Sequence, residues 1–207
     1  MNENLYKQAN YLALFTISYN LVEGAASVWF GVADETLSLF GFGVDSLIEV
    51  ISAIGIWHLL RRIRNNSGEA RDDFEQHALR ITGAAFYFLT AGLLATAGIN
   101  LYEGRKPEST FWGIVISIVS ISLMWYLIQQ KTKVGHALDS PAILADAACS
   151  RACLYLSLVL MLSSIGYALT GLAFLDAIGA ILISWLTFRE GREAFGKARG
   201  LSCICQH

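Results

Sequence analysis

The chain has 207 residues, of which 55% are hydrophobic and 15% are charged, and its mean hydropathy is +0.49. Soluble domains carry about 25% charged residues, so this composition is typical of an integral membrane protein. The formal net charge of -2 is too small to indicate a nucleic-acid partner.

Six stretches are long and apolar enough to cross a bilayer as helices, which takes about 20 residues each. In chain order, they cover residues 11–32, 36–60, 81–102, 111–128, 142–164 and 172–188. Gly166 is expected to mark the turn between the last two. The N-terminus shows no signal-peptide pattern, so insertion is expected to rely on the spans themselves. We therefore predict an all-α polytopic membrane protein with a short N-terminal segment (1–10), a six-helix transmembrane domain (11–195) and a short tail (196–207).

Lysine and arginine gather in the segments that would share one side of the membrane. Twelve of the fifteen basic residues fall in the N-terminal segment, the second-to-third and fourth-to-fifth connections, and the C-terminal tail. The opposite side has Arg105 and Lys106, and Arg151 lies inside the fifth span. Because cytoplasmic loops carry the excess of basic residues, both termini are predicted to be cytoplasmic. We expect the protein in a plasma or inner membrane.

Ionisable side chains inside the spans are costly in hydrocarbon and therefore indicate function. They are Glu23, Asp45, Glu49, Asp146, Arg151 and Asp176. In a helix, the four-residue spacing of Asp45 and Glu49 leaves the two carboxylates about 40° apart on one face. Two such acids in lipid need a cation, a proton or a compensating base, and Arg151 is one candidate for that base.

The fifth span presents a matching polar face with members at steps of three and four residues. These members are Asp146, Cys149, Ser150 and Cys153. If the second and fifth spans face each other, two carboxylates and two thiols meet near the middle of the membrane. The predicted ligands are Asp45, Glu49, Cys149 and Cys153. Such a set suits a tetrahedral divalent cation such as Zn²⁺, and thiolates favour softer ions. Each cysteine could instead be a small packing residue, so this alternative stays open.

Other polar residues are candidates for secondary roles. Those that could support the site or couple it to protons are Glu23, Asp146 and Asp176. For Asp176 a simpler interpretation is capping, because an acid is favourable at the N-terminus of the sixth helix. In the tail, the Cys-x-Cys of Cys203 and Cys205, with His207, could capture a soft metal or have no function.

Nearly the whole chain, about residues 11–195, resembles the transmembrane domain of the cation diffusion facilitator family, and the second span is the most specific part of this resemblance. Residues 38–49 are similar to the metal-site helix of that family, which carries an acid or His and then an Asp four residues later. Residues 145–153 resemble its partner helix, in which His or Asp stands at the position of Cys149 and Asp at that of Cys153. Residues 175–180 resemble its last helix.

The chain departs from the family pattern in two ways. Glu49 replaces the common Asp, and two cysteines replace the His/Asp pair, which leaves the carboxylates as the firmer half of the ligand set. The usual cytoplasmic metallochaperone-like domain of the family is not expected, because a short tail follows the last span. If the protein is a homodimer, its membrane helices must form the interface, and small residues of the third span such as Gly92, Ala95 and Gly98 suit close helix packing.

The resemblance implies export of a divalent heavy metal, Zn²⁺ or Cd²⁺ in particular, from the cytoplasm by proton antiport through a site at mid-membrane. The protein is then not an enzyme, has no permanent cofactor, and takes the metal ion and protons as substrates. One alternative is a membrane metal sensor or partner protein that binds metal without transport. Another is a membrane thiol-redox protein, which the absence of a C-x-x-C motif disfavours.

Overall fold

In the computed structural model, the described residues are 3–64, 73–103, 110–172 and 174–199. They form α1 (Glu3–Ala33), α2 (Leu37–Arg64), α3 (Asp73–Glu103), α4 (Phe111–Ala137), α5 (Pro141–Thr170) and α6 (Phe174–Ala198). Within these ranges the secondary structure is helical apart from turns, which confirms the predicted all-α class and its six helices.

Four of these helices are long and apolar enough to cross a membrane by length and composition. The apolar segments are Leu37–Gly55, Leu79–Tyr102, Phe111–Ala137 and Asp146–Thr170. Helices α1 and α6 fall outside this set because polar residues interrupt their apolar stretches. Asn20 and Glu23 do so in α1, and Asp176 and Glu190 do so in α6.

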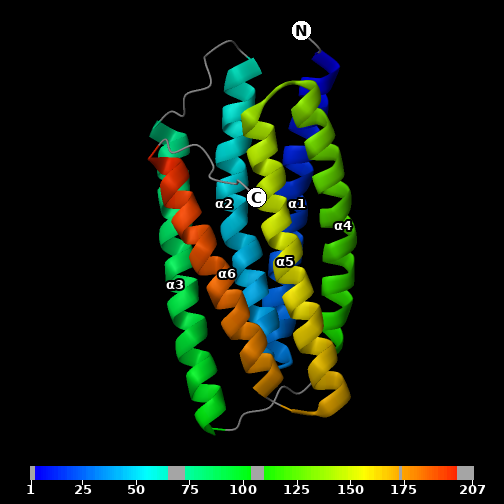
Figure 1. The fold of residues 1–207 in the computed structure, drawn as a ribbon, viewed down its shortest axis with the longest axis vertical. Helices are drawn as coiled ribbons and strands as arrows, with labels where there is room; N and C mark the ends of the chain where they lie inside the picture. Colours follow the sequence, from blue (N-terminus) through cyan, green and yellow to red (C-terminus); the bar gives the residue numbers. More distant parts are fainter. Residues whose placement is uncertain (1–2, 65–72, 104–109, 173, 200–207) are drawn as a thin grey trace.

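The helices stand side by side as one bundle, with α2 and α5 at its centre (Figure 1). The closest partners are α1 with α2, α3 with α6, and α4 with α5. The start of α1, the end of α2, the α4–α5 turn and the end of α6 lie at the same end of the bundle. This topology places the start of α1 and the end of α6 on one side, while the assignment of that side to the cytoplasm stays a prediction.

The interior of the bundle combines apolar clusters, with Phe42 and Leu160 among their members, with many buried polar side chains, and its outer surface is apolar. Small hydroxyl side chains are fully buried between the helices, among them Ser27, Ser120, Ser157, Ser184 and Thr187. Large apolar and aromatic side chains point outward, among them Trp29, Phe88, Trp125, Tyr155 and Trp185. Lipid is as apolar as these side chains, so an outward apolar surface carries no penalty in a bilayer.

Glycine allows α1 and α2 to approach closely. A Cβ atom on Gly43 would lie 2.6 Å from the backbone nitrogen of Val28, and one on Gly31 would lie 2.5 Å from that of Phe40. No side chain fits at these distances. Residues 37–51 of α2 are buried or half-buried throughout, so α2 is surrounded by the other helices.

Asp176 pins the start of α2 to α6. Its carboxylate accepts hydrogen bonds from the backbone N–H of Leu37 (2.9 Å), the backbone N–H of Ser38 (3.1 Å) and the Ser38 hydroxyl. Asp176 lies in the first turn of α6, as the capping interpretation expects, and its carboxylate in addition caps the start of α2.

Several helices extend beyond the predicted spans. Gly166 lies within α5, and Gly171 ends this helix with a φ of 66°, so the predicted turn at Gly166 was wrong. Helix α4 continues through Lys131, which the sequence analysis placed in a connection, and α6 continues through Lys197. Both lysines therefore belong to the bundle and not to solvated loops.

Candidate functional site

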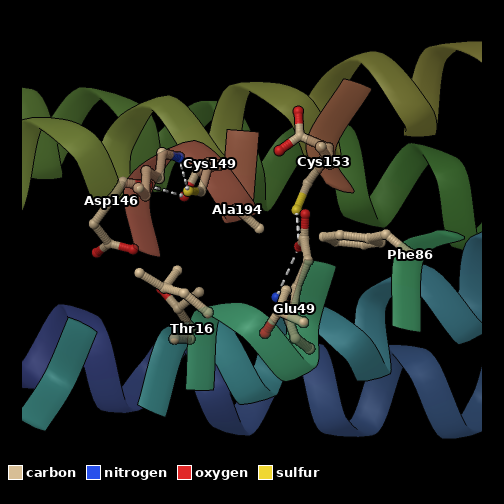
Figure 2. A pocket seen from close by; sticks show the side chains of 14 residues that line it. Thr16, Glu49, Phe86, Asp146, Cys149, Cys153 and Ala194 are labelled. Carbon is tan, nitrogen blue, oxygen red and sulfur yellow. Dashed lines mark hydrogen bonds between the residues drawn. The ribbon is translucent and has the colours of Figure 1, made fainter. Parts of the chain in front are cut away.

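A cavity of about 30 Å³ lies between the central helices of the bundle (Figure 2). This volume has room for one or two water-sized species. Its polar lining residues are Thr16, Asn20, Glu49, Asp146, Cys149, Ser150, Cys153, Glu190 and Lys197, together with Thr82. Among the described residues, every helix except α4 contributes to this lining.

The second and fifth helices meet across this cavity through Glu49 and Cys153. The Cys153 thiol donates a hydrogen bond to Glu49 Oε2, and Figure 2 shows the two side chains reaching toward each other from α2 and α5. Asn20 Nδ2 of α1 donates to the same carboxylate oxygen at 3.3 Å. Glu49 is 8% exposed and Cys153 is buried. One carboxylate and one thiol of the predicted ligand set are thus in direct contact near the middle of both helices.

Asp45 is buried one helical turn from Glu49 but does not line the cavity. Its side chain is 1% exposed, and its Oδ1 atom has no hydrogen-bond partner among the described residues. In this conformation, no three His, Cys, Asp or Glu side chains of the described ranges converge as a metal-binding group. Of the four predicted metal ligands, Glu49, Cys149 and Cys153 therefore line the cavity, whereas Asp45 is buried outside its lining.

Cys149 lies one turn from Cys153 on α5 and also lines the cavity (Figure 2). Lys197 Nζ of α6 lies 3.6 Å from its sulfur atom and 3.8 Å from Glu193 Oε2.

Asp146 also lines the cavity, at the end nearer the start of α5. Its Oδ2 atom lies 3.0 Å from Lys131 Nζ of α4, and both side chains are buried. The same ammonium group donates to Ser150 Oγ at 3.0 Å. Asp146, a predicted supporting residue, is thus already neutralised by a buried lysine.

Glu23 lies beside the second helix in a hydrogen-bonded cluster of its own. It accepts a hydrogen bond from the Tyr19 hydroxyl within α1 and one from the Ser46 hydroxyl of α2, at 3.4 Å. Glu23 is buried, and Ser46 is the neighbour of Asp45 in the chain. The cluster fixes the α1–α2 contact around the two candidate ligands of α2.

The remaining candidates lie elsewhere. Arg151 is exposed, and in the described part of the chain no ion pair joins it to Asp45 or Glu49. Cys203, Cys205 and His207 lie outside the described residues. Sequence reasoning missed Lys131, Glu190 and Lys197, whose positions follow the predicted ends of the fourth and sixth spans.

Comparison with known proteins identifies a related family. The model of the cation efflux transmembrane domain family matches residues 12–199. Transmembrane protein 163 of Xenopus laevis is 27% identical over 145 residues, which are 70% of this chain and 50% of that protein. The chain spans about half the length of this curated relative.

Proposed function

Since the chain belongs to the cation efflux family, whose members are transporters and not enzymes, we propose that it exports divalent heavy-metal cations from the cytoplasm in exchange for protons. The family and the apolar helices make it an integral membrane protein. The proposed substrates are Zn²⁺ and Cd²⁺.

The contact between Glu49 and Cys153 across the buried cavity supports this proposal most directly. The Glu49 carboxylate of α2 and the Cys153 thiol of α5 are hydrogen-bonded near the middle of the bundle, and a second thiol, that of Cys149, lines the same cavity. Mixed oxygen and sulfur ligands suit Zn²⁺ and Cd²⁺ better than Mg²⁺ or Mn²⁺. A buried polar site at the centre of a helix bundle is also where transporters bind their substrates.

Asp45 is the proposed fourth ligand, in a conformation that differs from this one. Its buried Oδ1 atom lacks a partner, and burying an unpaired carboxylate is costly unless a proton or a cation compensates it. About 40° of helix rotation separates it from Glu49 on α2. A rocking motion of helix groups, the usual basis of alternating access, would allow both carboxylates to contact one ion.

Proton exchange follows from the chemistry of the same pair. The hydrogen bond from Cys153 to Glu49 holds a proton at the point that the ion would occupy. Thiolate and carboxylate ligands bind metal only after they lose their protons, so metal entry at Glu49 and Cys153 releases protons. A lower pH on the far side of the membrane would return protons and displace the metal there. The proton gradient therefore sets the direction of export.

A homodimer through the membrane helices is also proposed. Gly92 and Gly98 of α3 are exposed, and a Cβ atom built on either would meet no heavy atom within 4 Å. Exposed small residues let two helices approach closely in lipid. By contrast, Gly83 is covered by Phe195 of α6 and serves packing within the bundle.

Metal flux in proteoliposomes tests the proposal. The purified chain would be reconstituted with a metal-sensitive dye inside, and uptake of Zn²⁺, Cd²⁺, Mn²⁺, Fe²⁺ and Co²⁺ would be compared with and without a pH gradient. We expect Zn²⁺ and Cd²⁺ flux that depends on the gradient and is abolished by Asp45→Asn. Flux that Asp45→Asn leaves undiminished would refute the role of Asp45, and saturable binding without flux would indicate a sensor instead.

A further inference from the structure

A buried ion pair beside the cavity is not used by the proposed transport site. Lys131 of α4 is 1% exposed, and its ammonium group contacts both Asp146 and Ser150 of α5 at 3.0 Å. Lysine is almost never buried to this degree unless it is paired. Close packing of the two helices places it there, since a Cβ atom on Gly135 of α4 would lie 2.8 Å from Leu144 of α5.

Asp146, the acid of this pair, lies where its carboxylate could bind a metal ion in the cavity. Asp146 lines the same cavity as Cys149 and Cys153, and the three residues lie on one face of α5 at steps of three and four. By position alone, Asp146 would add a carboxylate to the ligand set. Lys131 comes from α4, which contributes no described residue to the cavity lining, but its ammonium group contacts two lining residues, Asp146 and Ser150.

We propose that Lys131 is a specificity-determining residue, because its ammonium group holds the Asp146 carboxylate away from a cation bound at Glu49, Cys149 and Cys153. This inference rests on the proposed function, because it concerns which metal ion the proposed transport site prefers. With Asp146 retained by Lys131, sulfur makes up a large share of the available ligands. Releasing Asp146 would add a hard oxygen ligand and a negative charge, which favour Mn²⁺ relative to Cd²⁺.

Replacing the lysine by a neutral side chain of similar length tests this directly. Lys131→Met leaves Asp146 as a buried carboxylate without its partner, and such a group gains strongly from a new cation. We expect the Kd for Mn²⁺ to fall by about tenfold, and the Mn²⁺-to-Cd²⁺ ratio of Kd values to fall by a similar factor, because supporting residues of metal sites change affinity by about 10–100-fold.

The experiment uses the full chain in lipid nanodiscs, with CdCl₂, ZnCl₂ and MnCl₂ titrated by calorimetry. Lys133→Met is the matched control, because it removes an exposed lysine from the same helix and should leave both Kd values unchanged. The double variant Lys131→Met/Asp146→Asn removes both charges of the pair. If the freed carboxylate causes the change, this double variant should restore the wild-type ratio.

The outcomes separate this inference from the proposed function. Wild-type protein that binds neither Cd²⁺ nor Zn²⁺ overturns both. Wild-type protein that binds Cd²⁺, with an unchanged ratio in Lys131→Met, overturns the inference alone. If Lys131→Met does not fold, the double variant decides, because a buried pair can be replaced by neutral residues without loss of stability. If this double variant binds Cd²⁺ as the wild type does, the inference is supported. If its Cd²⁺ affinity falls by about tenfold, Asp146 is itself needed to bind the ion, and the inference is overturned.

Discussion

Removing the negative charge of Asp176 should destabilise the protein through the start of α2. In Asp176→Asn, a single oxygen acceptor remains for the two backbone N–H groups of Leu37 and Ser38, which now contact Asp176 at 2.9 and 3.1 Å. A buried donor without an acceptor costs about 1–3 kcal/mol. Loss of the charge at a helix N-terminus adds about 0.3–1 kcal/mol. We therefore expect the free energy of unfolding to fall by about 2–3 kcal/mol.

Thermal unfolding of the purified protein in detergent, followed by tryptophan fluorescence, measures this loss. The expected decrease in Tm is about 5–10 °C for a chain of this size. Glu35→Gln is the matched control, because Glu35 is an exposed acid in the α1–α2 turn, and its Tm should equal that of the wild type. If Asp176 acted on its own helix alone, the loss would be at most about 1 kcal/mol. Equal Tm values for the two variants would refute the pinning of α2 to α6.

Three other predictions concern the site and the packing around it. Cys153→Ser keeps a hydroxyl donor to Glu49 and should fold, but its Cd²⁺ affinity in calorimetry should fall by about 100-fold with little change for Mn²⁺; equal losses for both ions would contradict a thiolate ligand. Gly43→Val should lower the free energy of unfolding by about 2 kcal/mol or more, because its Cβ meets the Val28 backbone, whereas Gly196→Val, in open space on α6, should not. Zn²⁺ binding should tighten by about tenfold per pH unit for each proton released, and weaker binding at higher pH would contradict the proton exchange.

Much of the fold could be predicted from hydropathy, but the ends of the helices could not. An apolar window ends where charges begin, so hydropathy places residues 129–133 and 189–193 beyond the ends of the fourth and sixth spans. In the structure, Lys131 is buried because Asp146 on the neighbouring helix neutralises it. A pairing between two helices does not alter the local hydropathy of either. The same reason explains why Glu190 and Lys197 were not recognised as lining the cavity.

For the candidate site, helical spacing could predict which residues share one face of a helix, but not how the helices are rotated against each other. The four-residue steps in α2 and α5 identified faces that do meet, as the contact between Glu49 and Cys153 shows. Spacing did not predict that Asp45 would stand outside the cavity lining, since this depends on the rotation of α2 against α5. Nor did it predict the target of Asp176, because the α2 residues that it contacts are far away in sequence.

The ion pair between Lys131 and Asp146 also has a consequence for biogenesis. A charged side chain is costly to insert into lipid, by up to about 2.5–3.5 kcal/mol for a lysine or an aspartate at the centre of a helix, and Lys131 and Asp146 lie toward the adjoining ends of α4 and α5. Here the two charges belong to consecutive helices joined by a short turn, so α4 and α5 can neutralise each other as soon as both have been synthesised. This helical hairpin can leave the translocon as one electrically balanced unit, before α6 has been made.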